Sequence, residues 1–171
     1  LRRLRRQILL ATDACLSSVR FPYDQDTHNA HLVRARIMQG RIVNLLVAYF
    51  LTGRQAYRDA ALAQGREIGN WEYWSWITWR QKNPDPLAIF GLSYGENSTT
   101  LAILYDLLHA ELSETDRRHF QHIATRRSFD PFLQHTRQDA SHQPAWWFGH
   151  RQSNWNTVCA GGAGMLALAG A

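Results

Sequence analysis

A helical spacing of apolar residues recurs along almost the whole sequence and limits the fold more than any other feature. One stretch follows the i, i+3, i+4, i+7, i+8 pattern of a one-sided apolar stripe. Gly53, just beyond it, is a typical helix stop. A second helical pattern starts within a few residues, and such a short connection predicts an antiparallel helical pair. The stripe consists of Ile42, Leu45, Leu46, Tyr49 and Phe50.

The remaining elements also read as helices, and no stretch has the alternating pattern of a convincing β-strand. Repeated helical pairs separated by longer loops are typical of solenoids and α/α toroids. The sequence does not begin with Met, and its last helix has no stop signal. We therefore expect an all-α fold in which residues 1–171 form an incomplete (α/α) toroid domain, truncated at both ends. Further helices are predicted at 101–112 and 113–123, and from Asp130 and Asn154 onward, with a long loop at 136–150.

The beginning of the chain has a basic head and a short apolar stretch, which together imitate a signal peptide. Asp13 interrupts the apolar stretch and no small-residue cleavage site follows, so we expect an amphipathic helix instead. No apolar run is long enough to span a membrane. Cys15 and Cys159 cannot form a disulfide scaffold and are predicted to be buried.

The net charge is +5, and Lys82 is the only lysine among 19 basic residues. A basic chain is attracted to polyanions, but no nucleic-acid-binding module can be found. Neither a Walker loop nor a dinucleotide fingerprint is present, so no cofactor is predicted. His28 with His31, and His119 with His122, have a three-residue spacing but no completing zinc ligand. We expect exposed histidines and no metal.

The segment from residue 146 to residue 162 carries the most chemical information. Aromatic residues, cations and amides lead directly into a helix, and a cap formed by Ser153 or Asn154 explains only one of them. Helix starts favour anions, and indole faces suit the apolar faces of sugar rings. The sequence therefore predicts an anion- and sugar-binding site. Its residues are Trp146, Trp147, His150, Arg151, Asn154 and Asn156.

One motif in this segment, Asn154-Trp-Asn-Thr-Val-Cys-Ala-Gly-Gly, resembles the Asn-Trp-Asn-x-Val-Cys-x-Gly-Gly segment of the heparinase II/III-like family. Three upstream stretches are also similar to that family, and the resemblance covers most of the chain from about residue 37. They are Gly95-Glu-Asn-Ser-Thr-Thr-Leu-Ala-Ile-Leu-Tyr-Asp-Leu-Leu, Leu112-Ser-Glu-Thr-Asp-Arg-Arg and Ala48-Tyr-Phe-Leu-Thr-Gly-Arg-Gln-Ala-Tyr.

The resemblance implies an α/α toroid followed by β-sandwich domains in a periplasmic or secreted polysaccharide lyase. Such enzymes cleave uronic-acid polymers, such as heparin, heparan sulfate or alginate, by β-elimination. Asn154 matches the residue that neutralises the substrate carboxylate, with His150 and Arg151 adding positive charge. The family's catalytic Tyr and second His would lie beyond residue 171, and Tyr94 and Tyr105 do not match that Tyr. Trp146 and Trp147 are predicted sugar platforms, Trp155 shapes the site, and Asn156 is predicted to bind substrate.

Two other functions stay open. An α/α-toroid glycoside hydrolase would need two carboxylates across a cleft. The available ones are Asp24, Asp26, Asp85 and Glu96, and no motif pairs them. A non-catalytic glycan-binding protein would keep the scaffold without the Tyr. An anionic polysaccharide is the expected partner, and the sequence leaves the oligomeric state open.

Overall fold

A computed structural model describes residues 2–17, 30–75, 89–137 and 145–170 of the chain. All regular secondary structure in these ranges is helical, and no strand occurs within them, which confirms the all-α prediction. The Trp-rich stretch enters the described part only up to Ser75. The helices before the middle of the chain are α1 (Arg2–Asp13), α2 (Ala30–Thr52) and α3 (Gln55–Asn70).

The predicted helical pair is present as α2 and α3. Gly53 follows the last residue of α2 with φ +70° and donates its backbone N–H to the carbonyl of Tyr49 at 2.7 Å. This left-handed residue ends the helix, because a side chain there would be strained. The chain then reverses within two residues, so α3 packs antiparallel against α2.

The second half of the chain contains one long α-helix without a π turn, at 92–108, and two later helical runs, at 114–136 and 154–168, each with a single π-helical turn. The short helix predicted from Asp130 is present and begins at that residue, but the predicted cap at Asp130 is wrong. The dihedral angles of Phe129 and Asp130 are helical, so the preceding helical turn continues into this helix without a break. The elements are α5 (Leu92–Leu108), η2 (His109–Glu111), α6 (Glu114–Ala124), η3 (Thr125–Phe129), α7 (Asp130–Thr136), η4 (Asn156–Ala160) and α8 (Gly161–Leu168).

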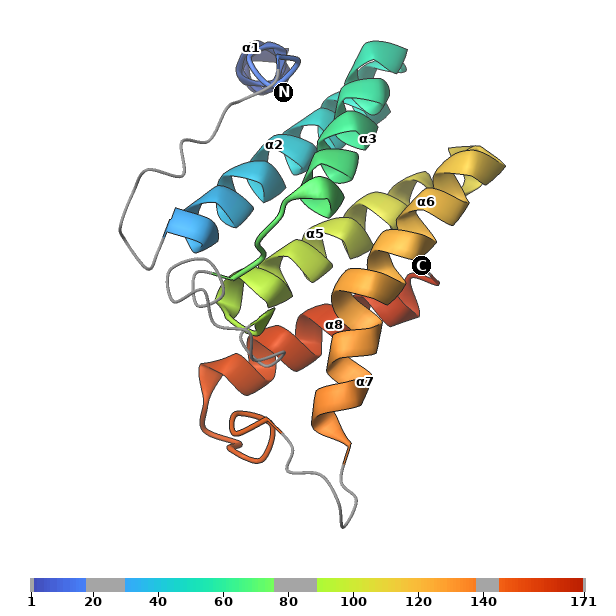
Figure 1. Cartoon of the computed structure of the whole chain (residues 1–171). Coiled ribbons are helices and arrows are strands. Elements are labelled where there is room, and N and C mark those ends of the chain that lie inside the picture. Colours follow the sequence, from blue (N-terminus) through green and yellow to red (C-terminus); the bar gives the residue numbers. More distant parts are fainter. Residues whose placement is uncertain (1, 18–29, 76–88, 138–144, 171) are drawn as a thin grey trace.

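These helices form two layers (Figure 1). In one layer α2, α5 and α8 lie side by side and run in the same direction. In the other layer α3 and α6 run in the opposite direction. The first helix, α1, packs on α2. Each pair therefore contributes one helix to each layer. The described helices form an open array, and closure into a toroid stays a prediction.

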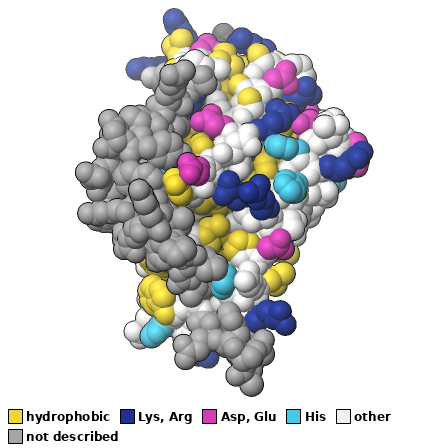
Figure 2. Space-filling model, viewed as in Figure 1, with side chains coloured by type: hydrophobic (Ala, Val, Ile, Leu, Met, Phe, Trp, Pro, Cys, Tyr) yellow, Lys and Arg dark blue, Asp and Glu magenta, His cyan; other side chains and the backbone are white. Residues whose placement is uncertain are grey.

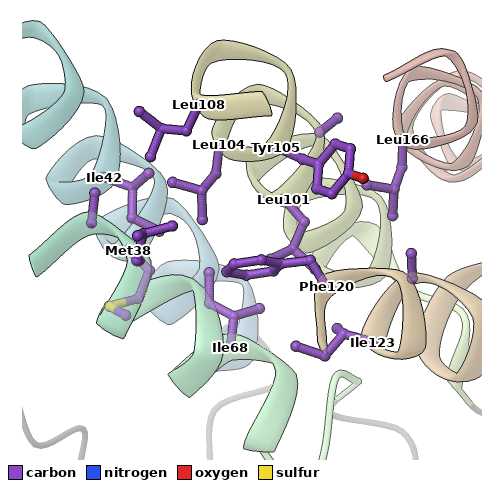
Figure 3. Close-up of a cluster of buried hydrophobic side chains, with 14 of the residues drawn as sticks. Met38, Ile42, Ile68, Leu101, Leu104, Tyr105, Leu108, Phe120, Ile123 and Leu166 are labelled. Carbon is purple, nitrogen blue, oxygen red and sulfur yellow. The ribbon is translucent and has the colours of Figure 1, made fainter. Parts of the chain in front are cut away.

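The core lies between the two layers, where apolar side chains from five helices point toward one another (Figure 3). Tyr94 and Tyr105 are buried there, as are Cys159 and Trp74. This burial agrees with the structural role predicted for the two tyrosines. The labelled cluster consists of Met38, Ile42, Ile68, Leu101, Leu104, Tyr105, Leu108, Phe120, Ile123 and Leu166.

Of the four histidines predicted to be exposed, His122 is exposed, His119 is half-buried, and His28 lies outside the described residues. The prediction for His31 is wrong. His31 is buried at 2% exposure, close to the guanidinium of Arg34 at 3.2 Å. Arg34 lies over the Trp71 ring, 3.6 Å from its centroid, and donates to the carbonyl of Tyr73 at 2.6 Å. Burial lowers the pKa of His31, and it lowers the pKa of Arg34 to about 9. His31 lies against Arg34 and the backbone of Tyr73, which follows α3, and its polar character did not reveal these contacts.

Candidate functional site

The candidate site lies where the last helical run begins, at residue 154. Ser153 caps this run, because its hydroxyl oxygen accepts the backbone N–H of Trp155 at 3.3 Å. The carbonyl of Ser153 also accepts the N–H of Asn156 at 3.0 Å. Asn154, by contrast, is exposed, and its side chain makes no hydrogen bond to any described residue. The capping role is therefore filled by Ser153, and the Asn154 amide is left to solvent.

An exposed aromatic cluster lies directly before this helix start. Trp146 is 60% exposed, and its ring centroid lies 5.4 Å from that of Trp155 and 6.0 Å from that of His150. Trp155 is half-buried, while His150 is exposed. The three rings are tilted against one another, at 44° between Trp146 and Trp155 and 58° between Trp146 and His150. A contiguous exposed cluster of this kind is a candidate binding surface.

The charge near this helix start is positive or neutral. Arg151 and His150 are exposed, and no acidic residue occurs in the first turn that follows. Arg151 forms no ion pair with a described residue. Figure 2 shows basic and acidic side chains interspersed over the face it presents, so the net charge is not gathered into one basic surface on that face. The positive character of the site is therefore local to these residues and to the helix start.

The prediction that Trp147 is a sugar platform is wrong. Its side chain is only 1% exposed and lies in the core, with ring centroids 5.1 Å from Phe90 and 6.3 Å from Phe132. A sugar ring cannot reach it there. In this turn the two adjacent side chains point in different directions. The Trp146 ring lies on the surface, and the Trp147 ring lies in the core and anchors the turn. The sequence alone could not tell which ring was which.

Asn156 is also placed differently from the prediction. Its side-chain N–H groups donate to the carbonyls of Phe148 at 2.7 Å and Trp147 at 3.3 Å. These contacts tie the start of the helix to the preceding turn and use the amide donors that a substrate would need. The role of Asn156 is therefore to hold the loop, and the predicted direct contact with substrate is wrong for its N–H groups.

The helix that carries Asn154 is seated on α5 through an unusually close backbone contact. A Cβ atom on Gly95 would overlap the carbonyl of Val158, and one on Gly162 would overlap the carbonyl of Gly95. The absence of a side chain at both glycines allows this close approach of the two backbones. Cys159 donates its thiol to the carbonyl of Gly91 at 3.5 Å, and burial raises its pKa to about 12. That thiol stays protonated at neutral pH and is no nucleophile.

The two π turns were missed by the sequence analysis. Such turns often occur at functional sites, and both of these contact the first turns of α5. In one, the Ser128 carbonyl accepts the hydroxyl of Tyr94 at 2.8 Å, and the Ser98 and Ser128 hydroxyl oxygens lie 3.0 Å apart. Burial raises the pKa of Tyr94 well above its usual range, so this hydroxyl is a poor base. A π turn has no distinct sequence signal, because its dihedral angles resemble those of an α-helix.

The carboxylates that a glycoside hydrolase would need are not brought together in the described part. Glu96 pairs with Arg36, with both Nε and Nη2 at 3.0 Å from one oxygen. The predictions at Asp24, Asp26 and Asp85 lie outside the described residues. Within the described ranges, no three His, Cys, Asp or Glu side chains come together as a metal site requires.

Comparison with known proteins gives no family for this chain: no protein-family model matches the sequence, and no curated protein matches it significantly. The likeness to the heparinase II/III-like family therefore stays a prediction that rests on the motifs quoted above. None of the described helices combines the length and hydropathy that crossing a membrane requires.

Proposed function

We propose that this chain supplies the carboxylate-binding part of a polysaccharide lyase that acts on a uronic-acid polymer. One observation carries the proposal. Asn154 presents an exposed amide at a helix start, while Ser153 performs the capping that would otherwise explain an Asn there. An exposed, unbonded amide that follows closely after Arg151 and His150 in the chain suits recognition of a carboxylate. The motif around Asn154 supports the same role through its resemblance to the family.

The proposed reaction is a β-elimination. A base removes the proton on C5 of the uronic acid, a double bond forms between C4 and C5, and the bond from C4 to the glycosidic oxygen breaks. The leaving oxygen takes up a proton. Negative charge develops on the C5 carboxylate before the bond breaks, and the Asn154 amide stabilises it by donating a hydrogen bond. An amide does so without depending on its own protonation state.

His150 and Arg151 add positive charge at the rim, which favours an anionic polymer. Trp146, backed by Trp155, offers the apolar face on which a sugar ring can stack. We place the reaction in the periplasm or outside the cell, as the family resemblance implies. The base would come from a Tyr and a His outside this sequence.

The proposed architecture is part of an (α/α) toroid. The parallel alignment of α2, α5 and α8 in one layer supports it, as does the opposite direction of α3 and α6 in the other (Figure 1). Consecutive pairs that each add one helix to both layers generate a curved, repeating array. The site then lies at one end of the layer that contains α8.

A second candidate is a glycan-binding protein without catalysis. The observation that favours it is the exposed aromatic surface of Trp146, which needs no base to bind a sugar. The described tyrosines 94 and 105 are buried in the core, so neither can serve as the base at this surface. A binding protein would keep the contacts of Asn154 and Trp146 and leave the polymer intact.

The test uses the full-length protein, because the chain by itself lacks the proposed base and is expected to be inactive. It is incubated with alginate, heparin, heparan sulfate and chondroitin sulfate in parallel. A lyase raises the ultraviolet absorbance, because elimination leaves a double bond conjugated with the carboxylate. New reducing ends without that absorbance would identify a hydrolase and overturn the proposal. Binding without either signal would favour the glycan-binding candidate.

A further inference from the structure

The loop that carries the exposed aromatic cluster is built as a series of tight turns from residue 145 to residue 156. Backbone bonds run from Phe148 N–H to Ala145 O at 2.9 Å, and from His150 N–H to Trp147 O at 3.2 Å. The series continues from Ser153 N–H to His150 O at 2.9 Å. Each of these turns contains four residues, so the position of the exposed rings depends on how the ends of the series are held.

Two contacts hold the first part of the loop. The N–H of Ala145 donates to the carbonyl of His135 at the end of α7, at 2.7 Å. The Trp147 ring is buried in the core, against the rings of Phe90, which precedes α5, and Phe132 of α7. These contacts fix where the loop begins, but they leave the orientation of the following turn relative to the helix undetermined.

The amide of Asn156 makes the remaining side-chain connection. It donates to two consecutive carbonyls, at 2.7 Å to Phe148 and 3.3 Å to Trp147, across the turn that lies between Trp146 and His150. Asn156 also follows Trp155 directly in the helix, so its amide links the backbone beneath both parts of the aromatic cluster. Within the described residues, no other side-chain hydrogen bond joins the helix start to residues 146–149.

We propose that Asn156 is a positioning residue for glycan binding, which sets Trp146 and His150 against Trp155 by fixing the turn before the helix. This proposal rests on the proposed function, because it takes the aromatic cluster to be the surface that receives the sugar. Asn156 contacts no substrate in this account. It acts by lowering the number of orientations that the loop must lose when a glycan binds.

The purely structural explanation is that Asn156 satisfies two buried carbonyls and stabilises the whole fold. The two explanations differ in where the effect of a substitution falls. A structural role lowers the melting temperature and exposes every cleavage site alike. A positioning role opens the loop locally, because regions held by few contacts can open without global unfolding.

The test compares Asn156→Leu, which has a similar shape but no donor, with Asn156→Gln, which keeps the amide. Thr157→Val serves as the control, since Thr157 is the exposed next residue. Trypsin cleavage after Arg151 reports loop opening, and cleavage after Arg126, inside the long helical run, reports global unfolding. Calorimetric titration with oligosaccharides of alginate, heparin and chondroitin sulfate reports binding.

Asn156→Leu is expected to speed cleavage after Arg151 by roughly tenfold or more, because it removes both hydrogen bonds of the amide. Cleavage after Arg126 should stay unchanged, and the affinity for the bound oligosaccharide should fall by a similar factor. Asn156→Gln should recover most of both, and Thr157→Val should match the parent protein. If Asn156→Leu does not fold, Asn156→Ala takes its place with the same expectations.

Equal affinity of the parent protein and Asn156→Leu for an oligosaccharide would overturn this proposal alone. So would equal acceleration of cleavage after Arg126 and Arg151. If the parent protein binds none of the oligosaccharides, the proposed function fails and the proposal fails with it. The loop cleavage would then still report whether Asn156 holds the turn, which keeps the two failures distinguishable.

Discussion

The two long helical runs of the second half are alike in construction and differ at their starts. One runs from Glu114 to Thr136 and the other from residue 154 to residue 168, and each contains a single π turn that packs on the beginning of α5. Each is also capped by a serine, Ser113 in the first and Ser153 in the second. The backbone therefore treats both starts in the same way.

The side chains in the first turn differ between the two helical runs. After Ser113 come two acidic residues, Glu114 and Asp116, which offset the positive end of the helix from within the chain. After Ser153 come neutral residues, and Arg151 precedes them. At the N-terminus of the first run, carboxylates of the chain itself offset the positive end of the helix. At the N-terminus of the second run, no carboxylate lies in the first turn. This difference is why we assign the second start to binding a carboxylate from outside.

The largest expected effect concerns the anchor of the second start. Trp147→Ala should destabilise the protein by about 3–5 kcal/mol, because it empties a core position that is 1% exposed. Trp146→Ala, at the neighbouring exposed ring, should change stability by less than about 0.5 kcal/mol and weaken glycan binding. Urea unfolding of both variants checks the contrast. Similar losses of stability in Trp147→Ala and Trp146→Ala would contradict the assignment of one ring to the core and the other to the surface.

The next largest effect concerns the contact of the second run with α5. Gly95→Ala should cost about 3 kcal/mol, because the added Cβ meets the Val158 carbonyl and backbone cannot turn aside. Gly164→Ala is the control, since nothing lies within 4 Å of its Cβ position. It should stabilise the helix by about 0.5 kcal/mol. Thermal melts measure both, and a harmless Gly95→Ala would contradict the close packing.

The first start should depend on its own polar contacts. Ser113→Ala should cost about 1 kcal/mol, because it removes the hydroxyl that accepts the Asp116 N–H at 3.1 Å. That hydroxyl also donates to the Asp116 carboxylate at 2.6 Å and, with Arg66, lowers its pKa. Denaturant unfolding at neutral pH measures the loss.

The lowered pKa of Asp116 also predicts a pH dependence. A carboxylate whose pKa is depressed by folding stabilises the protein above its ordinary pKa, and this contribution is lost as the pH falls through the folded value. The parent protein should therefore lose more stability than Ser113→Ala on acidification below about pH 4. Parallel acid losses in the two would show that Ser113 does not act on Asp116.

The smallest effect on stability should come from placing an acidic residue at the N-terminus of the second helical run, where the first run already has two. Asn154→Asp should stabilise the helix by about 0.3–1 kcal/mol, because an acidic residue then faces the positive helix end. The same change should weaken the binding of anionic oligosaccharides by repulsion. A thermal melt together with a binding titration tests both signs. Unchanged or tighter binding would contradict an anion site here.

Much of the fold could be predicted from the sequence. The spacing of Ile42, Leu45 and Tyr49 predicted α2, Gly53 its end, and Ser113 the cap of α6. These are local signals, in which a few neighbouring residues decide the backbone. The last helix was likewise predicted from Asn154 onward, with the small residues near Gly162 on its packing side.

The errors arose where tertiary contacts decide. Nothing local distinguishes the buried Trp147 from the exposed Trp146, and only the turn geometry assigns the Asn156 amide to carbonyls of the loop. The burial of His31 depends on α3 and Trp71, which are distant in sequence. Of the predicted site residues, Asn154, His150, Arg151 and Trp146 remain exposed together in one segment, as surface binding requires.

The central claim, that Asn154 serves binding and Ser153 serves the fold, is tested most directly by measuring Asn154→Ala and Ser153→Ala side by side. Each variant is assayed for ultraviolet-detected elimination on the best polymer and for its free energy of unfolding. We predict that Asn154→Ala loses about 100-fold or more in activity with stability unchanged. Ser153→Ala should lose about 1 kcal/mol of stability. Full activity of Asn154→Ala would contradict the account.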